Sequence, residues 1–207
     1  MTVSSVISSW RNALERAFLW RSQLSIAGSL LLCIAGAAFT GLFAQLSIRL
    51  PFGPVPITGQ VFAVLLAGAL LGRNCGAGSQ IIYVAAGAAG LPWFAGGTAG
   101  GVLGVSGGYL IGFVPAAWMV GHFAERGSAA RGVFGQALLM MGAVAVIYLF
   151  GAVQFAIVMR TGFAATVAGA VFPFIGIDVI KALCAASLAL ALLPKKSFAH
   201  TNSPTDA

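Results

Sequence analysis

The sequence predicts an all-α integral membrane protein with six transmembrane helices and with both termini in the cytoplasm. Charged residues make up only 7% of the chain and hydrophobic residues 59%, and the mean hydropathy is +0.99. A soluble domain carries about 25% charged residues, so this chain cannot cover a surface that faces water. Its apolar residues form long runs separated by polar or by glycine- and proline-rich segments, and each run is a candidate span.

Six apolar runs approach the length of roughly 20 residues that a spanning helix needs. Arg73 and Asn74 separate the second run from the third, and a charged turn, residues 125–131, separates the fourth from the fifth. The second and third runs are short for a full crossing, so we expect them either to tilt little or to begin inside the adjoining loops. The expected spans are residues 24–48, 58–72, 77–90, 108–123, 133–158 and 172–193.

The segments outside the spans complete the expected organisation. Residues 1–22 form a cytoplasmic amphipathic segment in which Trp10, Leu14 and Phe18 recur at helical spacing. We expect a helix on the membrane surface there, with a frayed tail as the alternative. Residues 23–194 form the six-helix membrane domain, and residues 195–207 form a cytoplasmic polar tail.

The distribution of lysine and arginine supports this orientation. With cytoplasmic termini, the inside segments hold eight of the 11 Lys and Arg residues and the outside segments hold two, Arg49 and Arg160. Cytoplasmic segments carry such an excess in membrane proteins. The proline-rich segment 49–57 and the glycine-rich segment 91–107 then both lie outside. Irregular backbone is tolerated at membrane depth only where protein buries it or a cavity borders it, so we expect residues 91–107 to cover a pocket.

Several classes of function are disfavoured. The net charge of +7 does not indicate nucleic acid, because the basic residues form no cluster. The chain has no Walker, HExxH or GxSxG motif and no metal-binding spacing. Cys33, Cys75 and Cys184 are expected to be buried free thiols. We therefore expect no enzyme, no metal and no cofactor, and either passive movement or a partner that uses ATP.

Two charged residues fall inside a predicted span, Asp178 and Lys181. They are three residues apart and share a helix face. Asp178 lies about 25 Å from Lys195 at 1.5 Å per residue, which places the pair towards the outer leaflet. An ionisable residue inside the membrane is a candidate functional site. A ligand carboxylate could bind Lys181, and ligand N–H groups could donate to Asp178. The alternative is a structural ion pair that neutralises itself.

Aromatic and amide side chains are expected near the same level, where an apolar pocket with a few polar groups would bind a small molecule. Interfacial anchoring is the alternative for the aromatic residues. An interhelical hydrogen bond is the alternative for the two glutamines. The candidates are Phe52, Tyr83, Trp93, Phe94, Tyr109, Gln60 and Gln80. Small residues at Gly36, Thr40 and Ala44 form a stripe that we expect to pack within the chain rather than against a partner.

Several segments resemble the BioY family in the order in which that family has them. The second-helix region, the third loop, the start of the fourth helix and the sixth-helix signature all match. The matching segments are 55–60 (VPITGQ), 66–72 (LAGALLG), 90–97 (GLPWFAGG), 107–113 (GGYLIGF) and Phe172-Pro173-Phe174 with Asp178 and Lys181. The family's usual Pro-Gly before the aspartate is replaced by Gly176 and Ile177.

The resemblance implies the biotin-binding S component of an energy-coupling-factor importer in a bacterial cytoplasmic membrane. It implies that Asp178 and Lys181 contribute to the biotin site and that residues 50–57 and 91–106, with Gly96 and Gly97, cover the ligand. The implied partners are a transmembrane coupling subunit (EcfT/BioN-like) and ATPase subunits (EcfA/BioM-like). A homo-oligomer is left open. The alternatives are a transporter for another vitamin, a membrane-embedded enzyme, and a structural subunit without a ligand.

Overall fold

The computed structural model describes residues 12, 13, 16, 20, 21, 23–51, 53–126 and 132–193. Helices dominate this part of the chain, and two strands of two residues each pair in an antiparallel hairpin. The expected surface helix with Trp10, Leu14 and Phe18, the candidate Phe52 and the tail lie outside the described residues. The elements are α2 (Ile26–Ala44), β1 (Ser47–Ile48), β2 (Ile57–Thr58), α3 (Gln60–Ala88), α4 (Gly107–Arg126), α5 (Val133–Met159), α6 (Phe163–Ala170) and α7 (Ile175–Leu192).

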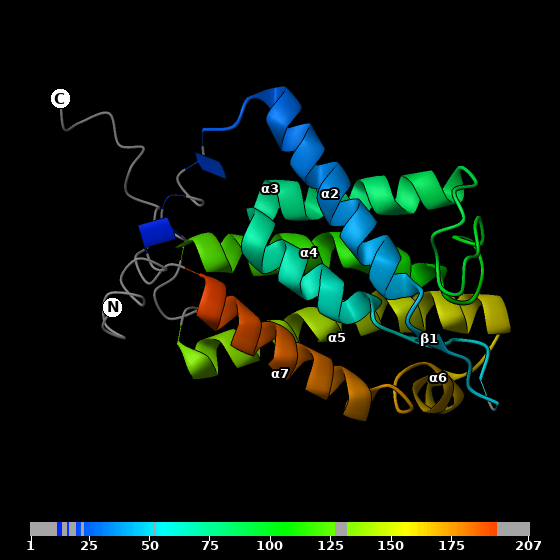
Figure 1. Cartoon of the computed structure of the whole chain (residues 1–207). Coiled ribbons are helices and arrows are strands. Elements are labelled where there is room, and N and C mark those ends of the chain that lie inside the picture. The colour runs from blue at the N-terminus through cyan, green and yellow to red at the C-terminus, as the bar shows by residue number, and fades with distance from the viewer. Residues whose placement is uncertain are drawn as a thin grey trace.

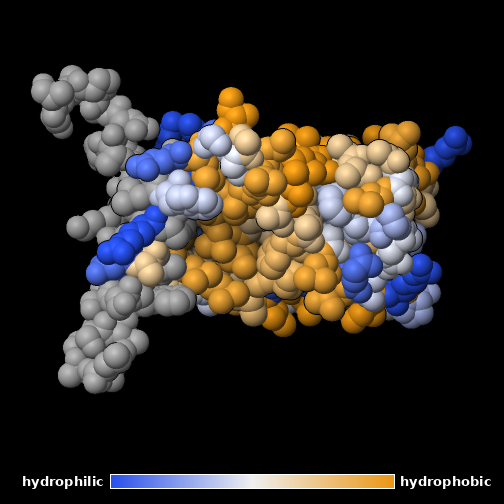
Figure 2. All heavy atoms as spheres, turned by 45° about the horizontal axis from the view of Figure 1, so that its top comes forward, coloured by the Kyte–Doolittle hydropathy of each residue, from blue (hydrophilic) through white to orange (hydrophobic). Residues whose placement is uncertain are grey.

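The helices run between two ends of the molecule (Figure 1). The bend of α3, the end of α4 and the start of α5 lie at one end, and the connections that follow α2, α3 and α5 lie at the other. Helix α3 packs against both α2 and α4, and α7 packs against α3 and α5. Figure 2 shows a broad hydrophobic belt around the middle of the visible face, with hydrophilic residues gathered at both ends.

Four of the described helices, α2, α3, α5 and α7, are long and apolar enough to cross a membrane. Their exposed side chains include Leu30, Leu138 and Ile180, which suits contact with lipid chains. The prediction of a helical membrane protein is therefore confirmed, while the number of spans and the side of the termini stay predictions.

The bend of α3 corrects the predicted boundary between the second and third spans. Arg73 and Asn74 were expected to end a span, but they are helical and only Gly72 departs from helical geometry, with φ 75° and ψ 179°. A residue with a Cβ is strained in that region, so one glycine reverses the chain and α3 appears as two arms in Figure 1. Arg21 supports the turn: its side chain donates to the Leu70 carbonyl at 2.7 Å and pairs with Glu125 at 3.1 Å.

Three other expectations are corrected. The first span ends at Ala44, because the next residues pair as β1 with β2 instead of continuing the helix. The sequence did not predict α6, which comes after Arg160 ends α5 in a left-handed conformation. The three cysteines are free, but Cys33 and Cys75 are only half-buried and Cys184 is exposed.

The stripe of small residues on α2 packs within the chain, as expected. Gly36, Thr40 and Ala44 are buried. A Cβ added at Gly36 would lie 2.8 Å from the Cβ of Ser79 on the second arm of α3. The Gln80 amide donates to the Thr40 hydroxyl at 3.1 Å. Gln80 therefore forms an interhelical hydrogen bond, which was the alternative to a ligand contact.

Candidate ligand-binding site

A cavity of about 590 Å³ lies where the β1–β2 hairpin, the segment after α3 and the start of α7 meet. Its volume falls within the range of roughly 300–1,000 Å³ that is usual for small-molecule sites. Apolar and aromatic side chains form most of its wall. They are Leu50, Val55, Ile57, Val61, Phe94, Val105, Leu110, Phe113, Tyr109, Tyr148 and Phe174.

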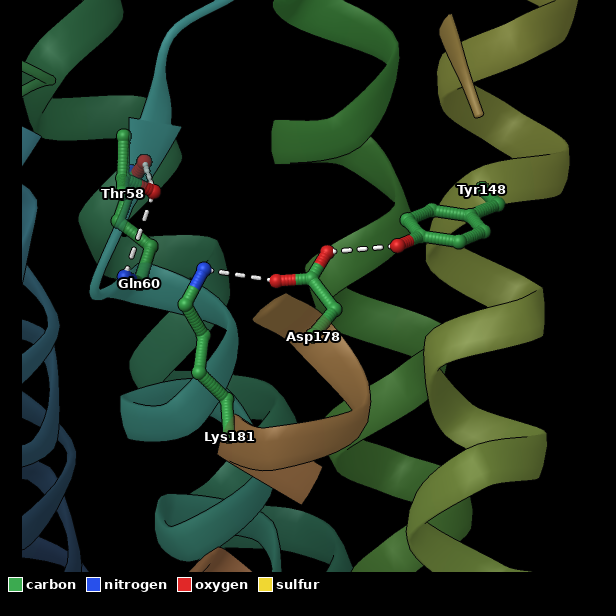
Figure 3. A network of polar contacts seen from close by, with 5 residues as sticks. All are labelled: Thr58, Gln60, Tyr148, Asp178 and Lys181. Atoms are coloured by element: carbon green, nitrogen blue, oxygen red, sulfur yellow. Dashed lines mark hydrogen bonds and ion pairs between the residues drawn. The ribbon is translucent and has the colours of Figure 1, made fainter. Parts of the chain in front are cut away.

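Asp178 and Lys181 lie together in the cavity wall (Figure 3). The Lys181 ammonium donates to Asp178 Oδ1 at 2.7 Å, and the two side chains are 15% and 5% exposed, respectively. The spacing of three residues on α7 produces this pair directly. Figure 3 shows the Lys181 side chain reaching from α7 towards Thr58, the last residue of β2, and Gln60, the first residue of α3.

Tyr148 on α5 completes the polar group around Asp178. Its hydroxyl donates to Asp178 Oδ2 at 2.8 Å, so each carboxylate oxygen already accepts one hydrogen bond. A carboxylate has about four lone-pair sites. Asp178 can therefore still accept from ligand N–H groups while it holds Lys181 and Tyr148. Because the charges of Asp178 and Lys181 cancel, this part of the cavity is polar but has no net charge.

The structure brings five of the proposed site residues to the cavity wall: Gln60, Phe94, Tyr109, Asp178 and Lys181. The other four, Tyr83, Trp93, Gly96 and Gly97, do not line it. Tyr83 is fully buried, and its hydroxyl accepts a hydrogen bond from the Gln60 amide at 2.7 Å. The Trp93 indole donates to the Tyr83 carbonyl at 2.9 Å. Tyr83 and Trp93 therefore anchor the segment between α3 and α4, residues 89–106, to α3; we call it the covering segment.

Gly96 and Gly97 act through the shape of that segment. Both have positive φ, 67° and 73°, and they form the tip of a turn in which the Phe94 N–H donates to the Thr98 carbonyl at 2.9 Å. The turn places Phe94 and Thr98 in the cavity wall. Gly176 and Ile177, which replace the usual Pro-Gly before the aspartate, are exposed in the first turn of α7 and do not line the cavity.

Sequence reasoning missed Tyr148, Thr98 and a role for Arg49 in the cavity. Arg49 is exposed at the cavity and forms no ion pair among the described residues. Thr98 lines it from the covering segment. Tyr148 carried a usable signal, because a tyrosine within an otherwise apolar span needs a partner for its hydroxyl.

No group of three or more His, Cys, Asp or Glu side chains that could hold a metal ion occurs in the part of the chain that the structure describes. His122 lies near the other end of α4, where it stacks on Trp118 with ring centroids 4.6 Å apart. The cavity thus joins apolar walls, a neutral polar group and one exposed cation. This arrangement suits binding of a small amphiphilic molecule.

Comparisons with known proteins identify the family to which the chain belongs. The sequence profile of the BioY family matches residues 15–197. A probable biotin transporter BioY from Pyrococcus horikoshii is 40% identical over 154 residues, which cover 73% of this chain and 88% of the relative. The biotin transporter BioY from Thermotoga maritima is 37% identical over 147 residues, which cover 70% and 85%.

A solved structure shares the fold. The crystal structure of the S-component for biotin from an ECF-type ABC transporter superposes with a TM-score of 0.75 at 26% identity, and the match covers 84% of this chain and 97% of that chain. The relatives are named as transporters rather than enzymes. With a profile match over most of its length, the chain belongs to the BioY family.

Proposed function

We propose that this protein captures biotin outside the cell and takes it up across the cytoplasmic membrane as the S component of an energy-coupling-factor importer. The observation that carries the proposal is the cavity lined by Asp178 and Lys181 beneath the two non-helical connections. Biotin has an apolar bicyclic ring, a neutral ureido group and a carboxylate on an alkyl tail. Each part has a chemically suitable partner in the cavity wall.

The distribution of charge favours one orientation of the ligand. Lys181 is already neutralised by Asp178 at 2.7 Å, so the neutral ureido group suits this region. Its carbonyl would accept from the Lys181 ammonium and its N–H groups would donate to Asp178. The carboxylate would then reach Arg49, the exposed cation on the β1–β2 hairpin. This orientation replaces the simpler alternative of a carboxylate bound by Lys181.

The arrangement in the membrane follows from the bend of α3. The two arms of α3 would give two crossings, and α2, α4, α5 and α7 would give one each, which supports the proposal of six. The excess of Lys and Arg favours an orientation with the bend at Gly72 inside and the cavity outside. The partners would be a transmembrane coupling subunit and two ATPases, and tilting of the loaded subunit would release biotin into the cytoplasm.

The test is biotin binding by the purified protein in detergent, with biotin and biotinamide compared. Arg49→Gln should weaken binding of biotin by about tenfold, since a partly exposed charge-assisted contact is worth roughly 1–2 kcal/mol. It should leave binding of biotinamide unchanged, because the amide has no charge. Lys181→Met should weaken both ligands. Arg160→Gln is the matched control, because Arg160 does not line the cavity.

Two results would overturn parts of the proposal. Failure of the folded wild-type protein to bind biotin would reject the ligand, and other vitamins would then be screened. Equal losses for biotin and biotinamide in Arg49→Gln would reject the orientation but keep the site.

A further inference from the structure

The segment between α3 and α4 is held at its C-terminal end by one side chain from α5. The Gln154 side-chain amide donates to the Val102 carbonyl at 2.7 Å and to the Gly104 carbonyl at 2.6 Å. A primary amide has two N–H groups, so both bonds can form at once. Gln154 itself does not line the ligand cavity.

The sequence at the start of α4 allows this close contact. A Cβ at Gly107 would lie 2.6 Å from the Gln154 side-chain nitrogen, and one at Gly108 would lie 2.7 Å from the Gln154 Cβ. Both distances are shorter than real Cβ atoms show, and the nearest atoms are the Val102 carbonyl oxygen at Gly107 and the Phe150 carbonyl oxygen at Gly108. Larger residues here would therefore displace the segment and α5 from the start of α4. The pair of glycines therefore makes room for the amide.

The anchored residues lie between two parts of the cavity wall. Thr98 to Gly101 line the cavity before them, and Val105 and Ser106 line it after them. Leu103, in the middle of the anchored stretch, is 90% exposed and so contributes little packing of its own. Gly100 and Gly101 have positive φ and carry no side chain that could fix the backbone.

The N-terminal end of the same segment is held separately. The Gln45 amide on the other side of the segment donates to the Trp93 carbonyl at 3.2 Å, and the Tyr83 hydroxyl also donates to it at 3.2 Å. Backbone hydrogen bonds hold the middle of the segment, from the Phe94 N–H to the Thr98 carbonyl at 2.9 Å and from the Gly100 N–H to the Gly87 carbonyl at 2.8 Å. Loss of Gln154 would thus loosen the residues after Gly100 and leave the Trp93 end and the middle in place.

We propose that Gln154 is a positioning residue that holds the last part of the covering segment, residues 101–106, closed over the cavity and thereby sets the rate at which a bound ligand escapes. The inference rests on the proposed function, because the escaping ligand is taken to be biotin. Gln154 acts through the Val102 and Gly104 carbonyls and has no contact with the ligand.

The test compares Gln154→Met, which keeps the length but has no N–H, and Gln154→Glu, whose carboxylate cannot donate. Val153→Ala is the matched control, because Val153 is the neighbouring residue on α5 and is 53% exposed. A spin label at Leu103→Cys, with the three native cysteines replaced, reports the mobility of the segment without ligand. Stopped-flow measurements with biotin give the association and dissociation rates.

We expect both Gln154 variants to raise the mobility of the label and to speed biotin dissociation by about tenfold or more, since two hydrogen bonds are lost. The association rate should change much less, and Val153→Ala should match the wild-type protein in every measurement. Unchanged mobility, or raised mobility with an unchanged dissociation rate, would overturn the inference.

If the wild-type protein binds no biotin, the proposed function fails, while the mobility of the label still decides whether Gln154 holds the segment. Thermal melting identifies a variant that is unfolded. The second substitution at Gln154 then provides the comparison.

Discussion

The ion pair between Asp178 and Lys181 gives the sharpest prediction, because a ligand-binding role and a purely structural role for the pair predict different behaviour of its variants. Both side chains are nearly buried, 5% and 15% exposed. Asp178→Asn would leave the Lys181 ammonium without its counter-charge, and Lys181→Met would leave the Asp178 carboxylate with only the Tyr148 hydroxyl. Removal of one partner of a buried pair costs about 3–5 kcal/mol, so each single variant should melt well below the wild-type protein.

The double variant Asp178→Asn/Lys181→Met should behave differently. Replacement of both charges in a buried pair is often neutral or stabilising, because neither group then has to be desolvated. We expect its melting temperature to return close to that of the wild-type protein, which gives a coupling energy of several kcal/mol between the two sites. Biotin binding should nevertheless be lost, because the two groups proposed to bind the ureido ring are gone.

The assay is thermal melting of the four proteins in one detergent, followed by isothermal titration calorimetry with biotin on those that are folded. Binding of biotin by the double variant with wild-type affinity would refute the site assignment and leave the pair with a structural role only. Single variants that melt like the wild-type protein would refute the reasoning about burial instead.

The other predictions concern the hydroxyl beside this pair and the bend of α3. Tyr148→Phe removes a hydrogen bond of 2.8 Å to the Asp178 carboxylate, and a bond to a charged group is worth roughly 1.5–3 kcal/mol. We expect biotin affinity to fall by about tenfold in calorimetry, and unchanged affinity would contradict the role given to Tyr148. Gly72→Ala forces a Cβ into a backbone conformation with φ 75°, at a cost of about 1–3 kcal/mol, and should lower the melting temperature. Gly176→Ala is its control, since a Cβ there meets nothing within 4 Å, and equal melting of the two variants would disprove the strain.

The class of fold could be predicted from the sequence because it depends on composition and on the length of apolar runs. The start of the fifth span, the Asp178–Lys181 pair and the intrachain packing of the α2 stripe follow from hydropathy and helical periodicity. The bend at Gly72 does not, because Arg73 and Asn74 are stronger local signals for a helix end at a membrane surface. The helix resumes at once after Gly72, and the contacts that Arg21 makes beside the bend, with the Leu70 carbonyl and with Glu125, are not visible in the local sequence.

In the cavity wall, too, some residues could be predicted from the sequence and others depend on tertiary packing. Asp178 and Lys181 could be found because charges are rare inside spans. Tyr83 and Trp93 carried an equally strong aromatic signal, but they bind each other's carbonyl groups and face α3 instead of the cavity. Sequence alone gives the level of an aromatic residue in the membrane, whereas its direction depends on packing that the pattern does not encode.

Tyr148 shows how depth could have supplied the missing partner. It lies 15 residues after Val133, the first residue of α5, or about 22 Å along the helix at 1.5 Å per residue. Asp178 lies 14 residues before Leu192, the last residue of α7, or about 21 Å from the same end of the molecule. A polar group in an apolar bundle needs a partner from the protein, because lipid offers none, and a shared depth makes Asp178 a candidate partner for the Tyr148 hydroxyl. The hydrogen bond between them leaves Asp178 with only part of its accepting capacity. Because Lys181 also cancels the charge of Asp178 at 2.7 Å, the net charge available to a ligand comes from the exposed Arg49 in the cavity wall rather than from the ion pair.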